Sequence, residues 1–307
     1  MSLHREARVI RLSAVQWRQA VSTRKQCDVE ESAVNAVGIE RIGFIGGGVM
    51  AEAIIRALLS KRIVKAEEVV ASDPLIERRS WLTRQYGVET TSDNRVAARA
   101  APIVVLAVKP QQMAEVLAGL RGVLEADQLV LSIAAGVTTR TIAEGLGHDC
   151  IVRVMPNTPA QIGAGMSVWT TTDAVTGAQR ESARVILQSL GRELFVQSED
   201  YLDMATAVNG SGPGFVFLFL EAMVDAAVHI GLARPIAEEL VIQSALGSVL
   251  MARESGKHLS ELRNMVTSPG GTTAEGLSAL EDGRLRAVVD RAISAAYERS
   301  RALGHST

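Results

Sequence analysis

The fold predicted for this 307-residue chain depends most on residues 42–51, Ile42-Gly43-Phe44-Ile45-Gly46-Gly47-Gly48-Val49-Met50-Ala51. Its first four residues predict a short apolar strand and its glycines a turn, and a helix is predicted from the apolar spacing of Ile54, Ile55 and Leu58. The spacing Gly46-x-Gly48-x-x-Ala51 matches the Rossmann fingerprint of dinucleotide-binding proteins, in the variant with alanine at the third position.

Each position in residues 46–51, called the glycine loop below, has its own physical role. Gly46 permits the tight turn, Gly48 lets a pyrophosphate approach the backbone, and Ala51 lets the helix pack close to the strand. The N–H groups of Val49 and Met50, at the start of the helix, would face the anion. The loop predicts a dinucleotide site, and a purely structural glycine turn is the alternative.

Strands and helices alternate after the glycine loop. Further strands are expected at 69–72, 87–90, 103–108, 129–133 and 151–155, with intervening helices that include 77–86 and 111–120. This alternation predicts an α/β, Rossmann-type, doubly wound parallel sheet with right-handed crossovers. Ligands of such sheets bind beyond the carboxyl ends of the strands.

Three loops at those strand ends carry small residues or prolines where ordinary polar loops would be expected. They are expected to border the nicotinamide end of the cofactor, because stiff loops hold polar groups at fixed distances. The predicted contacts are Ala107, Val108, Lys109 and Pro110 after one strand, Ala135 and Gly136 after the next, and Asn157 between two prolines.

The adenosine end of the site gives conflicting indications about the cofactor. Asp73 follows the second strand, where a carboxylate would accept from the ribose 2′-OH of NAD and disfavour a 2′-phosphate. Ser72, Asn94 and the pair Arg78 and Arg79 lie close enough in sequence to form a phosphate pocket, although an arginine pair is more often solvated surface. NADPH is the expected cofactor, and NADH is the alternative.

The second half of the chain is predicted to be helical. Helices are expected at 215–231, 235–254, 259–266 and 284–301. We therefore expect a dinucleotide-binding domain at 39–200 and a helical domain at 201–307. The long helices have more apolar surface than one small bundle needs, which favours a homodimer.

Residues 268–273, Ser-Pro-Gly-Gly-Thr-Thr, lie directly before a predicted helix and are called the hydroxyl loop below. Glycines beside hydroxyl residues at a helix start predict a nest of backbone N–H donors, which suits a carboxylate. An ordinary capped loop is the alternative, since Ser and Thr are favoured N-caps.

Composition excludes several classes of function. The net charge of -2 and an aromatic content of 4% argue against a nucleic-acid partner. The two cysteines, Cys27 and Cys150, are isolated, so no metal site and no disulfide framework is expected. A reducing, cytoplasmic location follows from the same observation.

No membrane partner is expected, because Glu221 and Asp225 soon interrupt the apolar run at 215–220. Residues 1–38 form an extension outside the predicted domains, and its first 25 residues contain five arginines, one lysine and a single acid, Glu6. An arginine-rich, acid-poor start can resemble a transit peptide, and an upstream extension without chemistry is the other interpretation.

Six segments together resemble the pyrroline-5-carboxylate reductase family. They are IGFIGGGVMAEAI (42–54), AVKPQQM (107–113), SIAAGVT (132–138), VRVMPNTPAQIGAG (152–165), NGSGPGFVF (209–217) and VTSPGGTTAEGL (266–277). The resemblance runs from Ile42 to about Gly304. One small departure is Gly214, where the family usually has alanine.

The resemblance implies reduction of Δ1-pyrroline-5-carboxylate to L-proline by NAD(P)H, the last step of proline biosynthesis. It implies a helical domain that interlocks in a dimer and dimers that build larger rings. It also implies that Ser268, Gly271, Thr272 and Thr273 hold the substrate carboxylate, with Thr273 near the ring nitrogen as a candidate catalytic donor. Asn94 matches the family position that contacts the adenosine ribose or its 2′-phosphate.

Two rival functions use the same layout. A β-hydroxyacid dehydrogenase needs a general base, usually a lysine on the first long helix of the second domain, and residues 201–256 contain no lysine. A non-catalytic NADP sensor would keep the glycine loop but would not need the hydroxyl loop.

Overall fold

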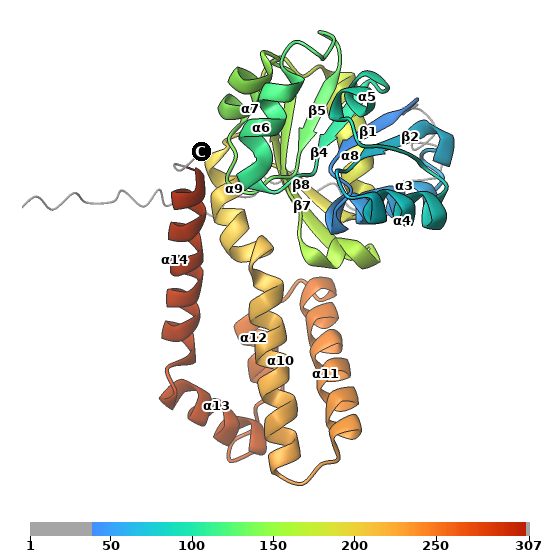
Figure 1. Cartoon of the computed structure of the whole chain (residues 1–307). Coiled ribbons are helices and arrows are strands. Elements are labelled where there is room, and N and C mark those ends of the chain that lie inside the picture. The colour runs from blue at the N-terminus through green and yellow to red at the C-terminus, as the bar shows by residue number, and fades with distance from the viewer. Residues whose placement is uncertain (1–38, 305–307) are drawn as a thin grey trace, which may run out of the picture. The chain divides into compact units, whose positions relative to one another are not determined.

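The computed structural model describes residues 39–304, which form two compact units, residues 39–205 with 303–304 and residues 206–302 (Figure 1). The extension predicted at residues 1–38 lies outside the described part. The first unit contains an eight-stranded sheet in the order β3-β2-β1-β4-β5-β6-β7-β8. Its strands are β1 (Ile42–Ile45), β2 (Val69–Ser72), β3 (Glu89–Thr91), β4 (Ile103–Leu106), β5 (Leu129–Ser132), β6 (Ile151–Met155), β7 (Gly165–Thr171) and β8 (Gly191–Phe195).

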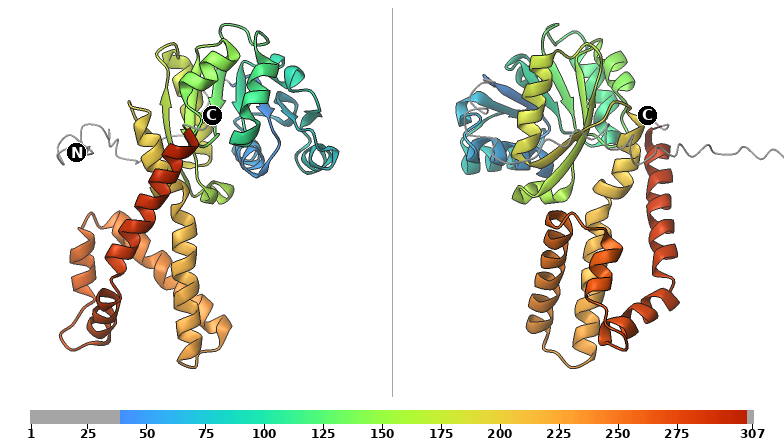
Figure 2. Two further views of the ribbon diagram at one scale, coloured as in Figure 1. Left: turned by 60° about the vertical axis from the view of Figure 1, so that its left-hand side comes forward. Right: turned by 180° about the vertical axis from the view of Figure 1, so that it is seen from behind.

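Helices cover both faces of this sheet, as the views in Figure 2 show. The α-helices of the first unit are α3 (Val49–Ser60), α4 (Ile76–Tyr86), α5 (Asn94–Arg99), α6 (Pro110–Leu120), α7 (Thr139–Leu146), α8 (Gly177–Ser189) and α9 (Asp200–Ala205), with short 3-10 turns at Ala66–Glu68 and Thr158–Ile162. Buried side chains of α3, α4 and α8 pack on one face, and those of α5, α6 and α7 pack on the other.

Strand alternation explains this division. In β4, Ile103 and Val105 belong to the core under α3 and α8, while Val104 and Leu106 belong to the core under α5 to α7. Successive side chains of a strand point to opposite faces, so a strand buried on both sides is apolar throughout. The six strands β1 to β6, which are neighbours in the order β3-β2-β1-β4-β5-β6, are all parallel. This confirms the predicted Rossmann-type class.

The edge of the sheet beyond β6 differs from the prediction. β7 pairs antiparallel with β6, and β8 pairs parallel with β7. Neither strand was predicted from the sequence. The two strands pack very closely at their start, where a Cβ on Gly191 would come 2.3 Å from the carbonyl oxygen of Gly165.

The second unit is helical, as predicted. After a π-helical turn at Thr206–Gly210 it contains α10 (Gly212–His229), α11 (Arg234–Glu254), α12 (Leu259–Met265), α13 (Thr272–Asp282) and α14 (Leu285–Gly304). Helices α10 and α11 pack against each other around Val224, Ala237 and Val241, the buried apolar cluster of this unit among the described residues.

Most of the apolar surface of α10 and α11 is exposed in the single chain. Phe217 is 60% exposed and Leu218 is 66% exposed. By length and composition alone, the helical stretches Asp200–His229 and Arg234–Glu254 could cross a membrane, with mean hydropathies of 1.4 and 1.2 over 18 residues. The expectation of no membrane partner used uninterrupted apolar runs, and isolated charges such as Glu221 interrupt the apolar residues of these helices.

Candidate active site

The glycine loop joins the end of β1 to the start of α3. Gly46 has a φ of +96°, a conformation that residues with a Cβ rarely adopt, and a Cβ there would lie 2.8 Å from the carbonyl oxygen of Ala107. A Cβ on Gly48 would meet no heavy atom of the described chain within 4 Å. The two glycines therefore differ: Gly46 is required by the fold itself, and Gly48 leaves a space in front of the helix.

The N-terminus of α3 faces that space. Gly48 is the N-cap, and no side chain of the described residues caps the helix. Val49 is 62% exposed, Met50 is half-buried, and Ala51 is fully buried against the sheet. Uncapped N–H groups at a helix start, together with the helix dipole, form an anion site. This geometry suits the pyrophosphate role predicted for the loop.

Asp73 and Arg78 hold the middle glycine of the loop from both sides. An Asp73 carboxylate oxygen, Oδ2, accepts from the Gly47 N–H at 3.0 Å, and Arg78 Nε donates to the Gly47 carbonyl oxygen. Asp73 Oδ1 also accepts from the N–H of Leu75 at 2.9 Å. Asp73, predicted to bind the cofactor ribose, thus supports the glycine loop through backbone hydrogen bonds.

Glu52, on α3, anchors the Arg78 side of this arrangement. Its carboxylate accepts from the Arg78 guanidinium, from Trp81 Nε1 at 3.1 Å and from the Tyr86 hydroxyl at 2.8 Å. Burial raises the pKa of Glu52, but these hydrogen bonds and the charge of Arg78 outweigh it, so the pKa lies below the usual value for glutamate. Burial raises the pKa of Tyr86, and the hydrogen bond to Glu52 and the charge of that carboxylate raise it further.

Ser72 and Asn94, both predicted to bind the cofactor at its adenosine end, lie together. The Ser72 hydroxyl lies 2.7 Å from Asn94 Oδ1 and 3.1 Å from the carbonyl oxygen of Phe44. Ser72 is buried and Asn94 is half-buried, so the amide is the group that remains accessible.

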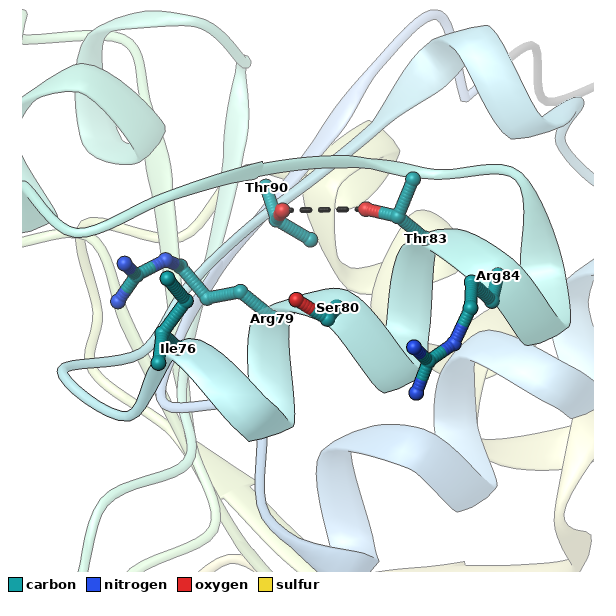
Figure 3. Close-up of a pocket in the computed structure, with 6 residues that line it drawn as sticks. All are labelled: Ile76, Arg79, Ser80, Thr83, Arg84 and Thr90. Atoms are coloured by element: carbon teal, nitrogen blue, oxygen red, sulfur yellow. Dashed lines mark hydrogen bonds between the residues drawn. The ribbon is translucent and has the colours of Figure 1, made fainter.

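The two neighbouring arginines have different roles. Arg78 is committed to Gly47 and Glu52, whereas Nη1 of Arg79 donates to the carbonyl oxygens of Asp73, at 2.7 Å, and Pro74, at 2.9 Å. Arg79 also lines an open depression on α4 and β3 (Figure 3), together with Ile76, Ser80, Thr83, Arg84 and Thr90. No residue of the glycine loop lines this depression, so it is separate from the anion site at α3.

The loops after β4 and β5 lie beside the glycine loop. Ile45, Leu106 and Ser132 occupy the same level of neighbouring strands, so the chain leaves the sheet there at adjacent points. Lys109 is the N-cap of α6, and Pro110 occupies its first turn. Gly136 has a φ of +76°. This carboxyl edge, at the point where the strand order reverses, is where doubly wound sheets bind ligands.

Asn157 has a structural contact in addition to its predicted role. Its Oδ1 accepts from the N–H of Met166 at 2.9 Å, which fixes the loop after β6 to the start of β7. The side chain is half-buried.

The hydroxyl loop of the second unit is a tight turn before α13. Gly270 has a φ of +68°, and Gly271 donates its N–H to the carbonyl oxygen of Ser268 at 3.0 Å. A Cβ on Gly271 would collide with Ser268 Oγ, so a larger residue there would require the Ser268 side chain to rotate away. Within the described chain no side chain caps α13, and the N–H groups of Thr272 and Thr273 open its first turn. Ser268 and Thr272 are exposed and Thr273 is half-buried.

This geometry suits a carboxylate at the hydroxyl loop, because hydroxyl and backbone donors converge at a helix start. Residues 39–304 contain no group of three or more His, Cys, Asp or Glu that could hold a metal ion. The loop-supporting roles of Arg78 and Glu52 were not predicted, because a helix residue that contacts a preceding loop leaves no local sequence pattern.

Comparison with known proteins gives matches over nearly the whole described chain. Residues 199–303 match the family model for pyrroline-5-carboxylate reductase dimerisation, and residues 41–136 match that for NADP oxidoreductase, coenzyme F420-dependent. A pyrroline-5-carboxylate reductase of Synechocystis is 40% identical over 264 residues, which cover 86% of this chain and 98% of the relative. The enzyme of Escherichia coli is 39% identical over 268 residues, covering 87% and 99%.

Solved structures agree with the sequence relatives. A pyrroline-5-carboxylate reductase from Coxiella burnetii has a TM-score of 0.80 at 38% identity, covering 87% of this chain and 98% of its own. A pyrroline carboxylate reductase from Plasmodium falciparum, solved with NADP bound, has a TM-score of 0.80 at 33% identity, covering 87% and 100%.

Proposed function

The chain belongs to the pyrroline-5-carboxylate reductase family, and we propose that it reduces Δ1-pyrroline-5-carboxylate to L-proline with NADPH as the hydride donor. The observation that carries this function is the match to family members at about 40% identity along almost their entire length, as for the relative from Synechocystis. The NADP bound in the relative from Plasmodium falciparum supports the choice of cofactor.

In this proposal the glycine loop holds the pyrophosphate. The uncapped start of α3 and the open space at Gly48 support this role. Ser72, Asp73 and Asn94 lie at the adenosine ribose, while Ala107, Val108, Lys109, Pro110, Ala135, Gly136 and Asn157 border the nicotinamide half. NADPH supplies the hydride, and the protein's contribution is to place the two reactants correctly.

The hydroxyl loop holds the carboxylate of the substrate. Ser268, Gly271, Thr272 and Thr273 provide hydroxyl and N–H donors at the start of α13. Hydride is added to the C=N carbon, which is more electrophilic when the ring nitrogen is protonated. Since the imine can arrive protonated, a strong protein acid is not required. In this proposal the Thr273 hydroxyl lies near the ring nitrogen: its oxygen accepts from the N–H of a protonated imine, and its O–H donates to the nitrogen of a neutral imine.

The helical unit would form a homodimer. The match of residues 199–303 to a dimerisation model and the exposed apolar surface of α10 support this, because a single chain leaves that surface in water. Assembly of dimers into a larger ring is part of the proposal. Sedimentation at micromolar concentration is expected to give a dimer or a multiple of it, and a monomer alone would contradict the proposed assembly.

A cytoplasmic location is also part of the proposal. A dimer interface would cover the apolar faces of α10 and α11 without a membrane. After cell fractionation and a high-salt wash, the full chain is expected in the soluble fraction. Recovery in the membrane fraction would contradict both the location and the absence of a membrane partner.

Steady-state oxidation of NADPH separates this function from its two rivals. Oxidation that depends on Δ1-pyrroline-5-carboxylate and yields proline supports the reductase. NADP⁺ reduction by β-hydroxyacids would instead indicate a β-hydroxyacid dehydrogenase, which the absence of lysine in residues 201–256 disfavours. NADPH binding without turnover of either substrate would indicate the non-catalytic sensor.

A further inference from the structure

Glu199 lies between β8 and α9 and binds two separate parts of the sheet domain. Its Oε1 accepts from the N–H of Thr139 at 2.8 Å and from Arg153 Nη1 at 2.7 Å. Its Oε2 accepts from the Thr139 hydroxyl at 2.9 Å. Both carboxylate oxygens are thus engaged by strong, directional donors.

Arg153 supports this carboxylate from inside the fold. It lies in the middle of β6, between Val152 and Val154, and its side chain is only 4% exposed. Its neighbours in the strand belong to the core under α3 and α8, so Arg153 faces the side of α7. A buried guanidinium needs acceptors, and it finds Glu199 and, at 3.5 Å, Asp203 of α9. The ion pair therefore holds Glu199 in one position.

Thr139 is the first residue of α7 and the end of the loop that follows β5. The beginning of that loop is fixed by the sheet, because Ile133 donates its N–H to the carbonyl oxygen of Leu106 at 3.1 Å. Glu199 fixes the end of that loop, because it accepts from both the N–H and the hydroxyl of Thr139. Between these two fixed points lie Ala135 and Gly136, the residues proposed to border the nicotinamide half of the cofactor.

The same contact distinguishes the helix starts at this edge of the sheet. The start of α7 is occupied by the Glu199 carboxylate and by the Thr138 hydroxyl, which accepts from the N–H of Thr141 at 3.1 Å. The start of α3 has no side-chain cap among the described residues. The Glu199 carboxylate thus offsets the N-terminal dipole of α7, whereas the start of α3 remains open to an anion.

We infer that Glu199 is a positioning residue, which holds the Ala135–Gly136 segment in place for the nicotinamide ring through Thr139, without touching the cofactor. The inference rests on the proposed function, because it requires a nicotinamide dinucleotide at this edge. It deepens that function by naming a residue that acts on one half of the cofactor only.

The test compares two ligands that differ by the nicotinamide ring, NADPH and 2′-phospho-ADP-ribose, in direct binding titrations of the full chain. We expect Glu199→Ala to raise the Kd for NADPH at least about fivefold and to leave that for 2′-phospho-ADP-ribose within about twofold. Glu199→Gln keeps an acceptor but loses the charge that Arg153 requires, so a smaller shift in the same direction is expected.

The matched control is Glu193→Ala. Glu193 is also a partly buried carboxylate of the first unit, accepting from Trp169 Nε1 at 2.6 Å, but it lies on the edge strand β8. We expect its removal to leave the ratio of the two Kd values unchanged. If Glu199→Ala does not fold, Glu199→Gln and Thr139→Val, which removes only the hydroxyl contact, provide the comparison.

Equal weakening of both ligands would overturn the inference, because it would indicate a general structural role. Unchanged binding of both ligands by folded variants would overturn it as well. Failure of the proposed function has a different result: the wild-type chain would then bind both ligands normally without oxidising NADPH in the presence of the imine, or would bind neither.

Discussion

The carboxylate of Asp73 accepts a hydrogen bond from the backbone N–H of Gly47, with 3.0 Å between Oδ2 and the nitrogen. The residue that follows the second strand and would face the cofactor ribose therefore also supports the loop that would hold the pyrophosphate. One side chain thus connects the position expected for the adenosine ribose with the loop expected to hold the pyrophosphate.

Asp73→Asn is expected to shift the cofactor preference towards NADPH. The amide oxygen can still accept from Gly47, while the hydrogen bond from Leu75 and the negative charge that would face a 2′-phosphate are lost. Repulsion between unit charges about 4–8 Å apart in water is roughly 0.5–1 kcal/mol, which corresponds to a change of about two- to fivefold in the ratio of Kd values. Titration of wild type and variant with NADPH and NADH measures that ratio.

Asp127→Asn is the control for Asp73, because it removes an exposed carboxylate just before β5, at the opposite edge of the sheet. The ratio of the Kd values for NADPH and NADH in Asp127→Asn should equal that of wild type. An unchanged ratio in Asp73→Asn would show that this carboxylate does not face the 2′-position.

Substitutions in the glycine loop should separate folding from binding. Gly46→Ala places a Cβ at a φ of +96° and 2.8 Å from a carbonyl oxygen, so we expect it to lower the free energy of unfolding by about 2 kcal/mol or more. Gly48→Ala meets open space in the described chain, and its stability should stay within about 1 kcal/mol of wild type.

For NADPH binding, Gly48→Ala should have the more direct effect of the two substitutions. In Gly48→Ala the new methyl group occupies the approach of the pyrophosphate to α3, so the Kd for NADPH should rise at least about tenfold in a fully folded variant. Urea unfolding and fluorescence titration measure the two quantities. A Gly48→Ala variant that binds NADPH as tightly as wild type would remove this loop from the cofactor site.

Thr273→Ala is expected to lower kcat by about tenfold or more, with the Kd for NADPH near that of wild type. The hydroxyl would act on the ring nitrogen in the reaction and not on the dinucleotide. Thr273→Ser retains the hydroxyl and should retain most of kcat. If Thr273→Ala reacts at the wild-type rate, the hydroxyl has no part in the mechanism.

The contribution of Glu52 to stability should depend on pH in the acid range. Its pKa is lower in the folded chain than the usual value for glutamate, so its contribution is present above the unfolded pKa and is lost as the pH falls through the folded pKa. Glu52→Gln should therefore destabilise the protein more at about pH 7 than at about pH 4.

Urea unfolding of wild type and Glu52→Gln at the two pH values tests this, with the exposed Glu67→Gln as control. The difference in free energy of unfolding between wild type and Glu67→Gln should be the same at both pH values. A Glu52→Gln difference that does not narrow in acid would contradict the lowered pKa.

Sequence periodicity predicted the elements around the glycine loop well. β2 and β6 have the predicted bounds, Val69–Ser72 and Ile151–Met155, because short apolar runs between turn residues have few other interpretations. β7 was missed, since Ser167 and Thr170 are buried polar residues within it and interrupt the apolar pattern.

The supporting contacts of the site were beyond the reach of local patterns. Arg78 holds Gly47 across 31 positions of sequence, and Glu199 holds Thr139 across 60. Such pairs depend on which helix lies over which strand end, and this is decided by the packing of the whole sheet. The glycine loop and the hydroxyl loop could be found because the residue types that each needs lie within a few consecutive positions.

The most direct test of hydride transfer from NADPH to the imine follows the transferred hydrogen itself. The full chain is incubated with NADPH deuterated at the transferable C4 position and with Δ1-pyrroline-5-carboxylate, and the product is analysed by mass spectrometry and NMR. The proposed reaction predicts L-proline with one deuterium on C5, the former imine carbon. Absence of proline, or proline without deuterium at that carbon while NADPH is consumed, would contradict it.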